Sequence, residues 1–195
     1  PRVRYLEVPA RPVYPTHSFH FWMVAGTDAA NLALSQCRGE WVAPLDHDDS
    51  FTDDPIARLL AAARAADADM VYGQGICESR SSAWRVIGST PLQCGAITHG
   101  SVLFRGPLAG VRFDPSAWLV GEPGDWNKWQ RMARAGARIG FLERVVLVHY
   151  MERTAIEGRA DIAGRDLEGD AATADADVAE DVRSTEAAWL AGLAR

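Results

Sequence analysis

The chain has few of the features that mark several large classes of protein. Its 195 residues include three cysteines, Cys37, Cys77 and Cys94, and none of them forms a Cys-x-x-Cys pair. An odd number at this spacing favours reduced, buried thiols in a cytosolic protein. No apolar run approaches the roughly 20 residues that span a bilayer, and no secretory signal peptide is visible. We therefore expect a soluble, cytoplasmic protein that could also bind a membrane surface peripherally.

Lysine is also scarce. Lys128 is the single lysine, and the formal net charge is −6, which argues against a nucleic-acid-binding protein. The acidic excess lies in residues 152–195, with eleven acids and five bases. Apolar residues from Val178 to Leu193 keep a helical spacing there. The composition thus predicts one domain over residues 1–151, followed by an acidic linker and a C-terminal helix over residues 152–195.

The pattern of apolar residues and turn formers predicts an α/β protein. Capping residues and apolar spacing predict helices that begin at Thr27, Pro55 and Asp125. Short apolar runs bounded by turn formers predict strands at residues 3–8, 41–45, 70–72, 84–87, 101–104 and 145–148. Residues 9–21 contain three prolines and are predicted to form a loop.

The most informative stretch is the apolar run 41–45 with the acids that follow it, Asp46, Asp48 and Asp49. A run of this length is typical of a buried strand, and open α/β sheets bind ligands where such strands end. Three carboxylates at that point repel one another unless a positive charge neutralises them. A divalent cation with oxygen ligands, which commonly also binds substrate phosphates, satisfies this requirement. The stretch therefore predicts a metal site.

Three other interpretations of the acidic stretch can be weighed from the residues. A calcium-binding EF-hand that starts at Asp46 is excluded, because Phe51 and Ala57 occupy the places of its glycine and its last glutamate. A phosphate-transferring aspartate, as in a phosphatase-like hydrolase, fits locally but would need Lys128. A solvated turn that caps the helix at Pro55 is the expectation for Asp53 and Asp54.

Two segments carry a resemblance to a known family. The first runs from Asn31 through Arg38-Gly39-Glu40-Trp41 to Asp46-His47-Asp48-Asp49, and it continues at Met70-Val71-Tyr72-Gly73. The second is Gly121–Gly136, with Asp125 and Arg131 at characteristic spacing. Together they resemble family 2 glycosyltransferases of the GT-A fold, over roughly residues 25–150. The resemblance implies a GT-A-like mixed sheet flanked by helices. It also implies a sheet that is incomplete on its N-terminal side, because nothing matches the family's first βαβ portion.

The resemblance also implies roles for single residues. Asp125 falls on the aspartate that acts as catalytic base in inverting members. Gly124 replaces the glutamate that usually precedes that aspartate, and Glu122 could stand in for it. The metal would be Mn²⁺ or Mg²⁺, held by Asp48 with help from Asp46, Asp49 and His149. Asn31 and Asp46 are expected to bind the nucleotide sugar, with His99 on the acceptor side.

The function implied by the resemblance is the metal-dependent transfer of a sugar, with inversion, from a nucleotide-diphosphate sugar to an acceptor hydroxyl. The acceptor would be a glycan, a lipid carrier or a small molecule. The alternative is a non-catalytic GT-A-like module that binds a glycan or another subunit. An incomplete sheet could also pair with a second copy to cover exposed edges, so a homo-oligomer is a further expectation.

Overall fold

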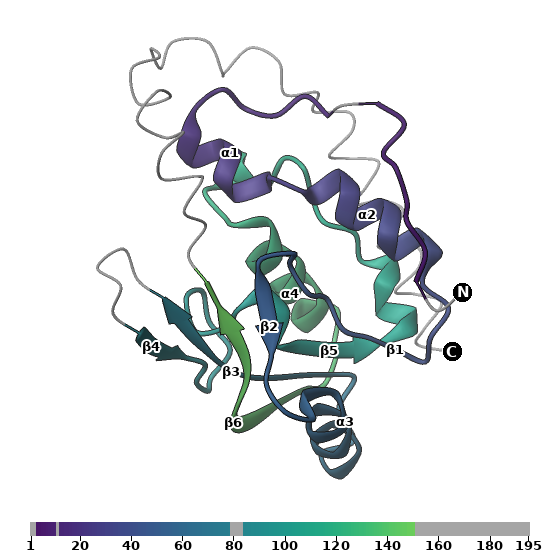
Figure 1. The fold of residues 1–195 in the computed structure, drawn as a ribbon, viewed down its shortest axis with the longest axis vertical. Helices are drawn as coiled ribbons and strands as arrows, with labels where there is room; N and C mark the ends of the chain where they lie inside the picture. The colour runs from purple at the N-terminus through teal and green to yellow at the C-terminus, as the bar shows by residue number, and fades with distance from the viewer. Residues whose placement is uncertain (1–2, 11, 79–83, 151–195) are drawn as a thin grey trace. The chain divides into compact units, whose positions relative to one another are not determined.

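A computed structural model of the chain describes residues 3–10, 12–78 and 84–150 (Figure 1). These residues belong to two compact units. Unit 1 comprises the described residues of Pro1–Arg38 and of Ala109–Arg131, and unit 2 comprises those of Gly39–Leu108 and Met132–Ile156. The predicted linker and C-terminal helix over residues 152–195 lie outside the described residues, so the expected boundary after residue 151 stays a prediction.

Unit 1 is built from helices. They are α1 (Ser18–Val24), α2 (Thr27–Gln36), the 3₁₀ helix η3 (Ala117–Val120) and α4 (Gly124–Arg134), whose last residues are grouped with unit 2. Met23, Val24 and Ala117 form a small buried cluster, with Tyr14 and Trp118 packed against it. Figure 1 shows α1 and α2 as consecutive helices joined by a short turn. Gly26 makes this turn possible, because its φ of +80° suits glycine better than any other residue.

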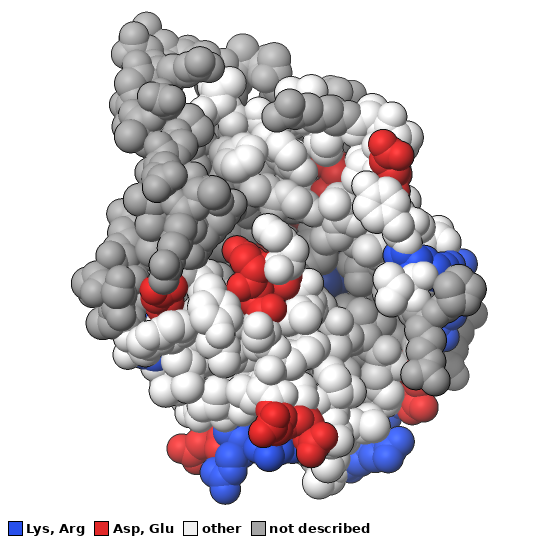
Figure 2. Space-filling model, in the orientation of Figure 1, with Lys and Arg blue, Asp and Glu red and all other residues white. Residues whose placement is uncertain are grey.

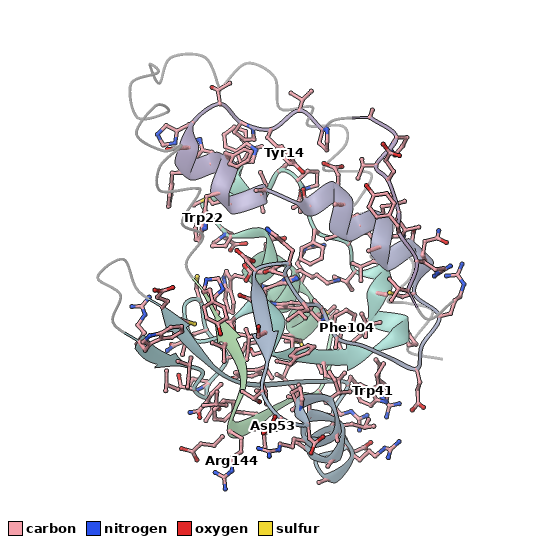
Figure 3. The ribbon with its side chains drawn as sticks, in the orientation of Figure 1. Tyr14, Trp22, Trp41, Asp53, Phe104 and Arg144 are labelled. Atoms are coloured by element: carbon pink, nitrogen blue, oxygen red, sulfur yellow. The ribbon has the colours of Figure 1, made fainter. Side chains whose placement is uncertain are left out.

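Two predictions for the N-terminal region are wrong. Residues 3–8 form no strand, and Val3 and Tyr5 are more than four-fifths exposed. An extended segment without a pairing partner cannot form a ladder, however well its residues alternate. The expected loop at 9–21 ends early, because α1 begins at Ser18. That helix turns Met23 and Val24 inward and leaves Phe19 and Trp22 stacked at its surface, with ring centroids 5.9 Å apart (Figure 3).

Unit 2 is built around one mixed sheet. Its strands are β1 (Trp41–Val42), β2 (Asp49–Phe51), β3 (Met70–Glu78), β4 (Trp84–Ile87), β5 (Val102–Arg105) and β6 (Ile139–His149). The strand order is β1-β5-β3-β6-β2, and β4 pairs with the second half of β3. The central pair, β3 with β6, is parallel, and the other pairs are antiparallel. This mixed sheet with helices confirms the predicted fold class, a partial GT-A-like α/β fold.

Helix α3 (Pro55–Ala65) packs against β3, β5 and β6 in unit 2 (Figure 1). The helix starts at Pro55, as predicted, because proline suits the first helical turn. Asp54 precedes it with a φ of +55°, and its side chain makes no capping hydrogen bond. The apolar face of α3 completes the main core, whose buried members are Leu59, Ala63, Val71, Leu103, Val146 and Leu147.

The strand predicted over 84–87 is confirmed as β4, and the one over 101–104 is β5, shifted by one residue, whereas β1 is shorter than predicted and β3 and β6 are longer. The run expected to form a buried strand over 41–45 pairs at Trp41 and Val42 alone, and both residues are half-buried. Pro44 explains the early end, since proline has no N–H to donate to a ladder. The carboxylates therefore do not close a buried strand. Instead, Asp49 opens β2, a strand that the sequence pattern did not predict.

The remaining global expectations have mixed outcomes. All three cysteines are free, and Cys77 is buried, Cys37 half-buried and Cys94 exposed. The prediction of buried thiols therefore holds for Cys77 alone. Within the described residues, no helix combines the length and the hydropathy needed to cross a bilayer.

An ion-pair network joins the start of β3 to the start of β6. Arg138 donates hydrogen bonds to both carboxylate oxygens of Asp69 and pairs with Asp67, and Arg105 lies 3.4 Å from Asp69. In the view of Figure 2, acidic and basic side chains also lie next to one another at the lower edge. The hydrogen bond from Arg138 holds the pKa of the Asp69 carboxyl below its usual value of 3.8.

This pKa gives the stability a defined dependence on pH. A carboxyl whose pKa is depressed in the folded state stabilises it above pH 3.8, and that contribution is lost as the pH falls through the folded-state pKa. We expect Asp69→Asn to unfold at lower urea concentration than the unmodified protein at neutral pH, and the difference to narrow below pH 3.8. Urea unfolding at a series of pH values measures this difference between the variant and the unmodified protein. Asp53→Asn is the control, because Asp53 is exposed, and a narrowing gap for this variant too would contradict the assignment.

Candidate functional site

The acidic residues of unit 2 lie in one tight turn, the carboxylate turn, which we define as Asp46, His47, Asp48 and Asp49. The backbone N–H of Asp49 donates a hydrogen bond to the carbonyl of Asp46, 3.2 Å away, and closes the turn. The chain then enters β2 and pairs with β6, with Asp49 opposite His149. The turn therefore presents its side chains at the end of the sheet where β6 finishes.

Asp49 is the buried member of the turn, with 2% of its side chain exposed. Its carboxylate accepts a hydrogen bond of 2.7 Å from Nδ1 of His149. That bond raises the pKa of His149 more than burial lowers it, and the charges of Asp48 and Asp46 raise it further. Gly100 leaves room for this pair, because a Cβ there would lie 2.8 Å from Leu147 and 3.4 Å from the second oxygen of Asp49.

The other two carboxylates of the turn are open to solvent. The side chain of Asp46 is 48% exposed and that of Asp48 is 28% exposed. Nε2 of His99 lies 3.9 Å from Asp46 Oδ1, so the structure does bring His99 to the carboxylate turn. His47 lies 3.8 Å from Asp48 but is itself almost fully exposed. The predicted residues Asp46, Asp48, Asp49, His99 and His149 thus gather in one part of unit 2.

The donor set fits a divalent cation that is shared with a phosphate. In the described ranges, no group of three or more His, Cys, Asp or Glu side chains is arranged to hold a metal ion by itself. Mg²⁺ and Mn²⁺ do not need such a cage, because they take one or two carboxylates and complete their shell with phosphate oxygens and water. Asp46 and Asp48 offer those carboxylates, and the imidazole of His149 is oriented by Asp49 in the manner of metal-binding histidines.

The second predicted group lies in unit 1, at the start of α4. Asp125 occupies the first turn of this helix, where the helix dipole favours a negative charge. One of its carboxylate oxygens accepts a hydrogen bond of 2.7 Å from the backbone N–H of Trp126. Asp125 is half-buried, so a reacting group can approach it. The position therefore suits a carboxylate that must remain ionised.

Glu122 is held in a chain of hydrogen bonds. Its carboxylate accepts from the side-chain amide of Asn127 at 2.7 Å, and the oxygen of that amide accepts from Arg131 at 2.8 Å. Arg131 in turn donates to the carbonyl of Arg112. These bonds tie the loop before α4 to the helix and to the segment around Arg112. The contacts of Glu122 are those of a structural residue.

Asn31 is also engaged within unit 1. Its amide donates to the carbonyl of Phe113 at 2.9 Å and accepts from the N–H of Phe113 at 2.8 Å. This pair of bonds fastens α2 to the segment around Phe113. The expectation that Asn31 binds the nucleotide stays a prediction, and the structure assigns the residue a packing role that sequence reasoning missed.

Two further residues bear on the site. Lys128 is fully buried, and its ammonium donates to the carbonyl of Val111. It is not exposed to a phosphate ligand, which disfavours the phosphatase-like interpretation. Cys77 was not predicted to be near the site, yet it pairs in register with His149. The signal that would have revealed it is the true length of β3, which continues to Glu78 rather than ending at Tyr72.

Comparison with known proteins supports a single family. Residues 25–107 match the model of the family described as glycosyl transferase family 2, a segment that includes the carboxylate turn and ends before Asp125. No curated protein matches the chain.

Among solved structures, that of TarS from S. aureus has a TM-score of 0.50 at 16% identity, covering 86% of this chain and 31% of TarS. The structure of residues 1–349 of TarS with UDP has a TM-score of 0.49 at 14% identity, covering 86% of this chain and 51% of that one. The chain thus spans about half or less of these proteins, and the likeness to the first of them shows the fold alone.

The bonds of Asn31 lead to a prediction about stability. We expect Asn31→Ala to lower the free energy of unfolding by about 1–3 kcal/mol, because it leaves the N–H and carbonyl of Phe113 without their partners. Chemical denaturation measures this change. Ser35→Ala, one turn along α2, is the control, because it removes only local bonds within α2, one to the carbonyl of Leu32 and one from the side chain of Gln36. If Asn31→Ala unfolds like the unmodified protein, the packing role is wrong.

Proposed function

We propose that the protein transfers a sugar from a nucleotide-diphosphate sugar to an acceptor hydroxyl, because residues 25–107 match the model of glycosyl transferase family 2. We further propose that the transfer depends on Mn²⁺ or Mg²⁺ and inverts the anomeric centre. The observation that carries the proposal is the carboxylate turn. It lies within the segment that matches the family, and it presents two accessible carboxylates beside a buried Asp49–His149 pair.

In this proposal the turn binds the donor. Asp48 and Asp46 would contribute oxygen ligands to the cation, and His149 would contribute the ring nitrogen that Asp49 does not engage. Once bound, the cation would offset the negative charge that develops on the leaving diphosphate. Asp49 keeps the imidazole in a fixed orientation, which is the usual role of a carboxylate behind a metal-binding histidine. His99, beside Asp46, lines the acceptor side of the donor.

Asp125 takes the proton of the acceptor hydroxyl. The hydroxyl oxygen forms a bond to the anomeric carbon while the bond from that carbon to the diphosphate oxygen breaks. The proton passes to a carboxylate oxygen of Asp125, and the electron pair leaves with the diphosphate. Direct displacement by the acceptor inverts the anomeric configuration. The hydrogen bond from the N–H of Trp126 to one carboxylate oxygen helps to orient the group.

The metal requirement is tested by calorimetry. We expect Mn²⁺ to raise the affinity of the purified protein for UDP or GDP sharply, because a cation held by the carboxylates would attract the negative charge of the diphosphate. Asp48→Asn should weaken the Mn²⁺-dependent binding by more than about tenfold. The matched control is Asp53→Asn, which lies beyond the far end of β2 beside the start of α3 (Figure 3). Nucleotide binding that is indifferent to Mn²⁺ would contradict the proposal, and no binding at all would favour a non-catalytic module.

The base is tested by kinetics. We expect Asp125→Asn to reduce sugar transfer by about a hundredfold or more, because an amide cannot accept the proton. The affinity for UDP with Mn²⁺ should stay nearly unchanged, since Asp125 is not assigned to donor binding. Product formation and calorimetry on the same preparations separate the two effects. If transfer survives in Asp125→Asn and is lost in Glu122→Gln, then Glu122 is the base.

A further inference from the structure

One row of side chains crosses four strands of the sheet in unit 2. Asp49 on β2 is in register with His149 on β6, His149 with Cys77 on β3, and Cys77 with Arg85 on β4. Residues directly opposite one another on neighbouring strands point to the same face of a sheet. The row therefore places Arg85 on the face that carries Asp49 and His149. With neighbouring strands about 4.8 Å apart, its Cα lies about 10 Å from that of His149.

The orientation of Arg85 is fixed by its neighbour. Trp84 points to the opposite face, because successive residues of a strand alternate. There its ring meets the ring of Tyr150 edge to face, with centroids 5.6 Å apart. This contact joins β4 to the residue that follows β6 and holds the short strand in register. Because Trp84 is held on one face, the next residue, Arg85, must lie on the other face, which carries His149 and Asp49.

The charge of Arg85 acts on this face of the sheet. Burial raises the pKa of the Cys77 thiol, the nearby Asp49 raises it further, and Arg85 lowers it. Both charged groups therefore lie close enough to influence one buried thiol between them. The effect of Arg85 on the pKa of Cys77 therefore agrees with the strand register, which places the two residues opposite one another.

Unlike Arg138 and Arg105, Arg85 has no carboxylate partner among the described residues. Arg138 is paired with Asp67 and Asp69, and Arg105 lies next to Asp69 and Glu40. Arg85 is exposed, and among the described residues no hydrogen-bonding or ion-pair partner holds its guanidinium. A planar guanidinium with five N–H donors, directed to the face of a predicted donor site, is suited to bind a phosphate with two parallel hydrogen bonds.

We infer that Arg85 binds a phosphate group of a substrate on the face of the sheet that carries His149 and Asp49. The inference rests on the proposed transfer from a nucleotide-diphosphate sugar and adds a positioning residue to it. A single cation leaves a nucleoside diphosphate with residual negative charge, and the fork of Arg85 would neutralise part of it. The same chemistry would also suit a phosphate carried by the acceptor.

Three calorimetric titrations with two probes, UDP and inorganic phosphate, distinguish a donor phosphate from an acceptor phosphate. The first titration uses UDP with saturating Mn²⁺, the second uses inorganic phosphate alone, and the third uses inorganic phosphate on protein already saturated with UDP and Mn²⁺. Arg85→Gln and Arg85→Lys are compared with the unmodified protein. A loss of about tenfold or more in UDP affinity assigns Arg85 to the donor diphosphate. Unchanged UDP affinity with weakened phosphate binding to the saturated protein assigns it to an acceptor phosphate.

The lysine variant tests the fork itself. Arg85→Lys keeps the charge but loses the bidentate geometry, so we expect an affinity between those of the unmodified protein and Arg85→Gln. Arg144→Gln is the matched control, because Arg144 is an exposed arginine of β6 that lies outside the row (Figure 3). Both positions are exposed, so thermal unfolding should show that all three variants remain folded.

The outcomes distinguish the inference from the proposed function. If the unmodified protein binds UDP with Mn²⁺, and Arg85→Gln binds UDP and phosphate equally well, the inference is overturned and the proposed function stands. If the unmodified protein binds no nucleoside diphosphate but binds phosphate in a manner that requires Arg85, the proposed function fails and the inference stands. If it binds neither probe, both fail. An equal loss in Arg144→Gln would show a general charge effect and would also overturn the inference.

Discussion

The hydrogen bond between the buried carboxylate of Asp49 and the imidazole of His149 is the interaction on which the candidate site depends. A carboxylate with 2% of its side chain exposed would lose on the order of several kcal/mol without a partner. The bond also fastens β2, a strand of three residues, to the end of β6. Asp48 immediately precedes β2, so the position of the accessible carboxylates follows from that attachment. The buried Asp49 thus determines where the accessible carboxylates of Asp46 and Asp48 lie.

The position of His149 depends in turn on an irregularity between β3 and β6. Met70 pairs with Ile139, an offset of 69 residues, whereas Cys77 pairs with His149, an offset of 72. The shift occurs between Tyr72 and Gly75. Had the first offset continued, Cys77 would lie opposite Val146 and the row that includes His149 would not form. Gly73 lies within this stretch, and a Cβ at that position would come within 2.7 Å of Val146, so the two strands can approach there because glycine has no side chain.

The sequence pattern predicted the starts of three α-helices within one residue, missed α1, and predicted the lengths of only some strands, for a physical reason. The starts of α2, α3 and α4 are set by residues within one turn of each start, Gly26, Pro55 and Asp125, so local patterns were enough to predict them. Strand lengths depend on pairing partners far along the chain. Strand β6 has seven residues more than the predicted strand 145–148, because β3 and β2 pair with it.

The same distinction explains the errors at single residues. Residues 3–8 have a strand-like pattern and no partner, whereas Asp49–Phe51 have no strand-like pattern and pair with β6. The carboxylate turn itself was identified from sequence, because its residue types are unusual wherever they occur. The pairing of Asp49 with His149, 100 residues apart, was not.

The contacts within unit 1 also distinguish the two candidate bases. Glu122 begins a chain of hydrogen bonds through Asn127 and Arg131 to the carbonyl of Arg112, so protonating it would weaken a bond that holds the start of α4. Asp125 follows in the first helical turn, where the bond from the N–H of Trp126 involves one oxygen and belongs to the helix start itself. A group that must gain and release a proton in every cycle should do so with little change in its surroundings. Glu122 does not meet that condition, and its structural role is therefore an argument against Glu122 as the base.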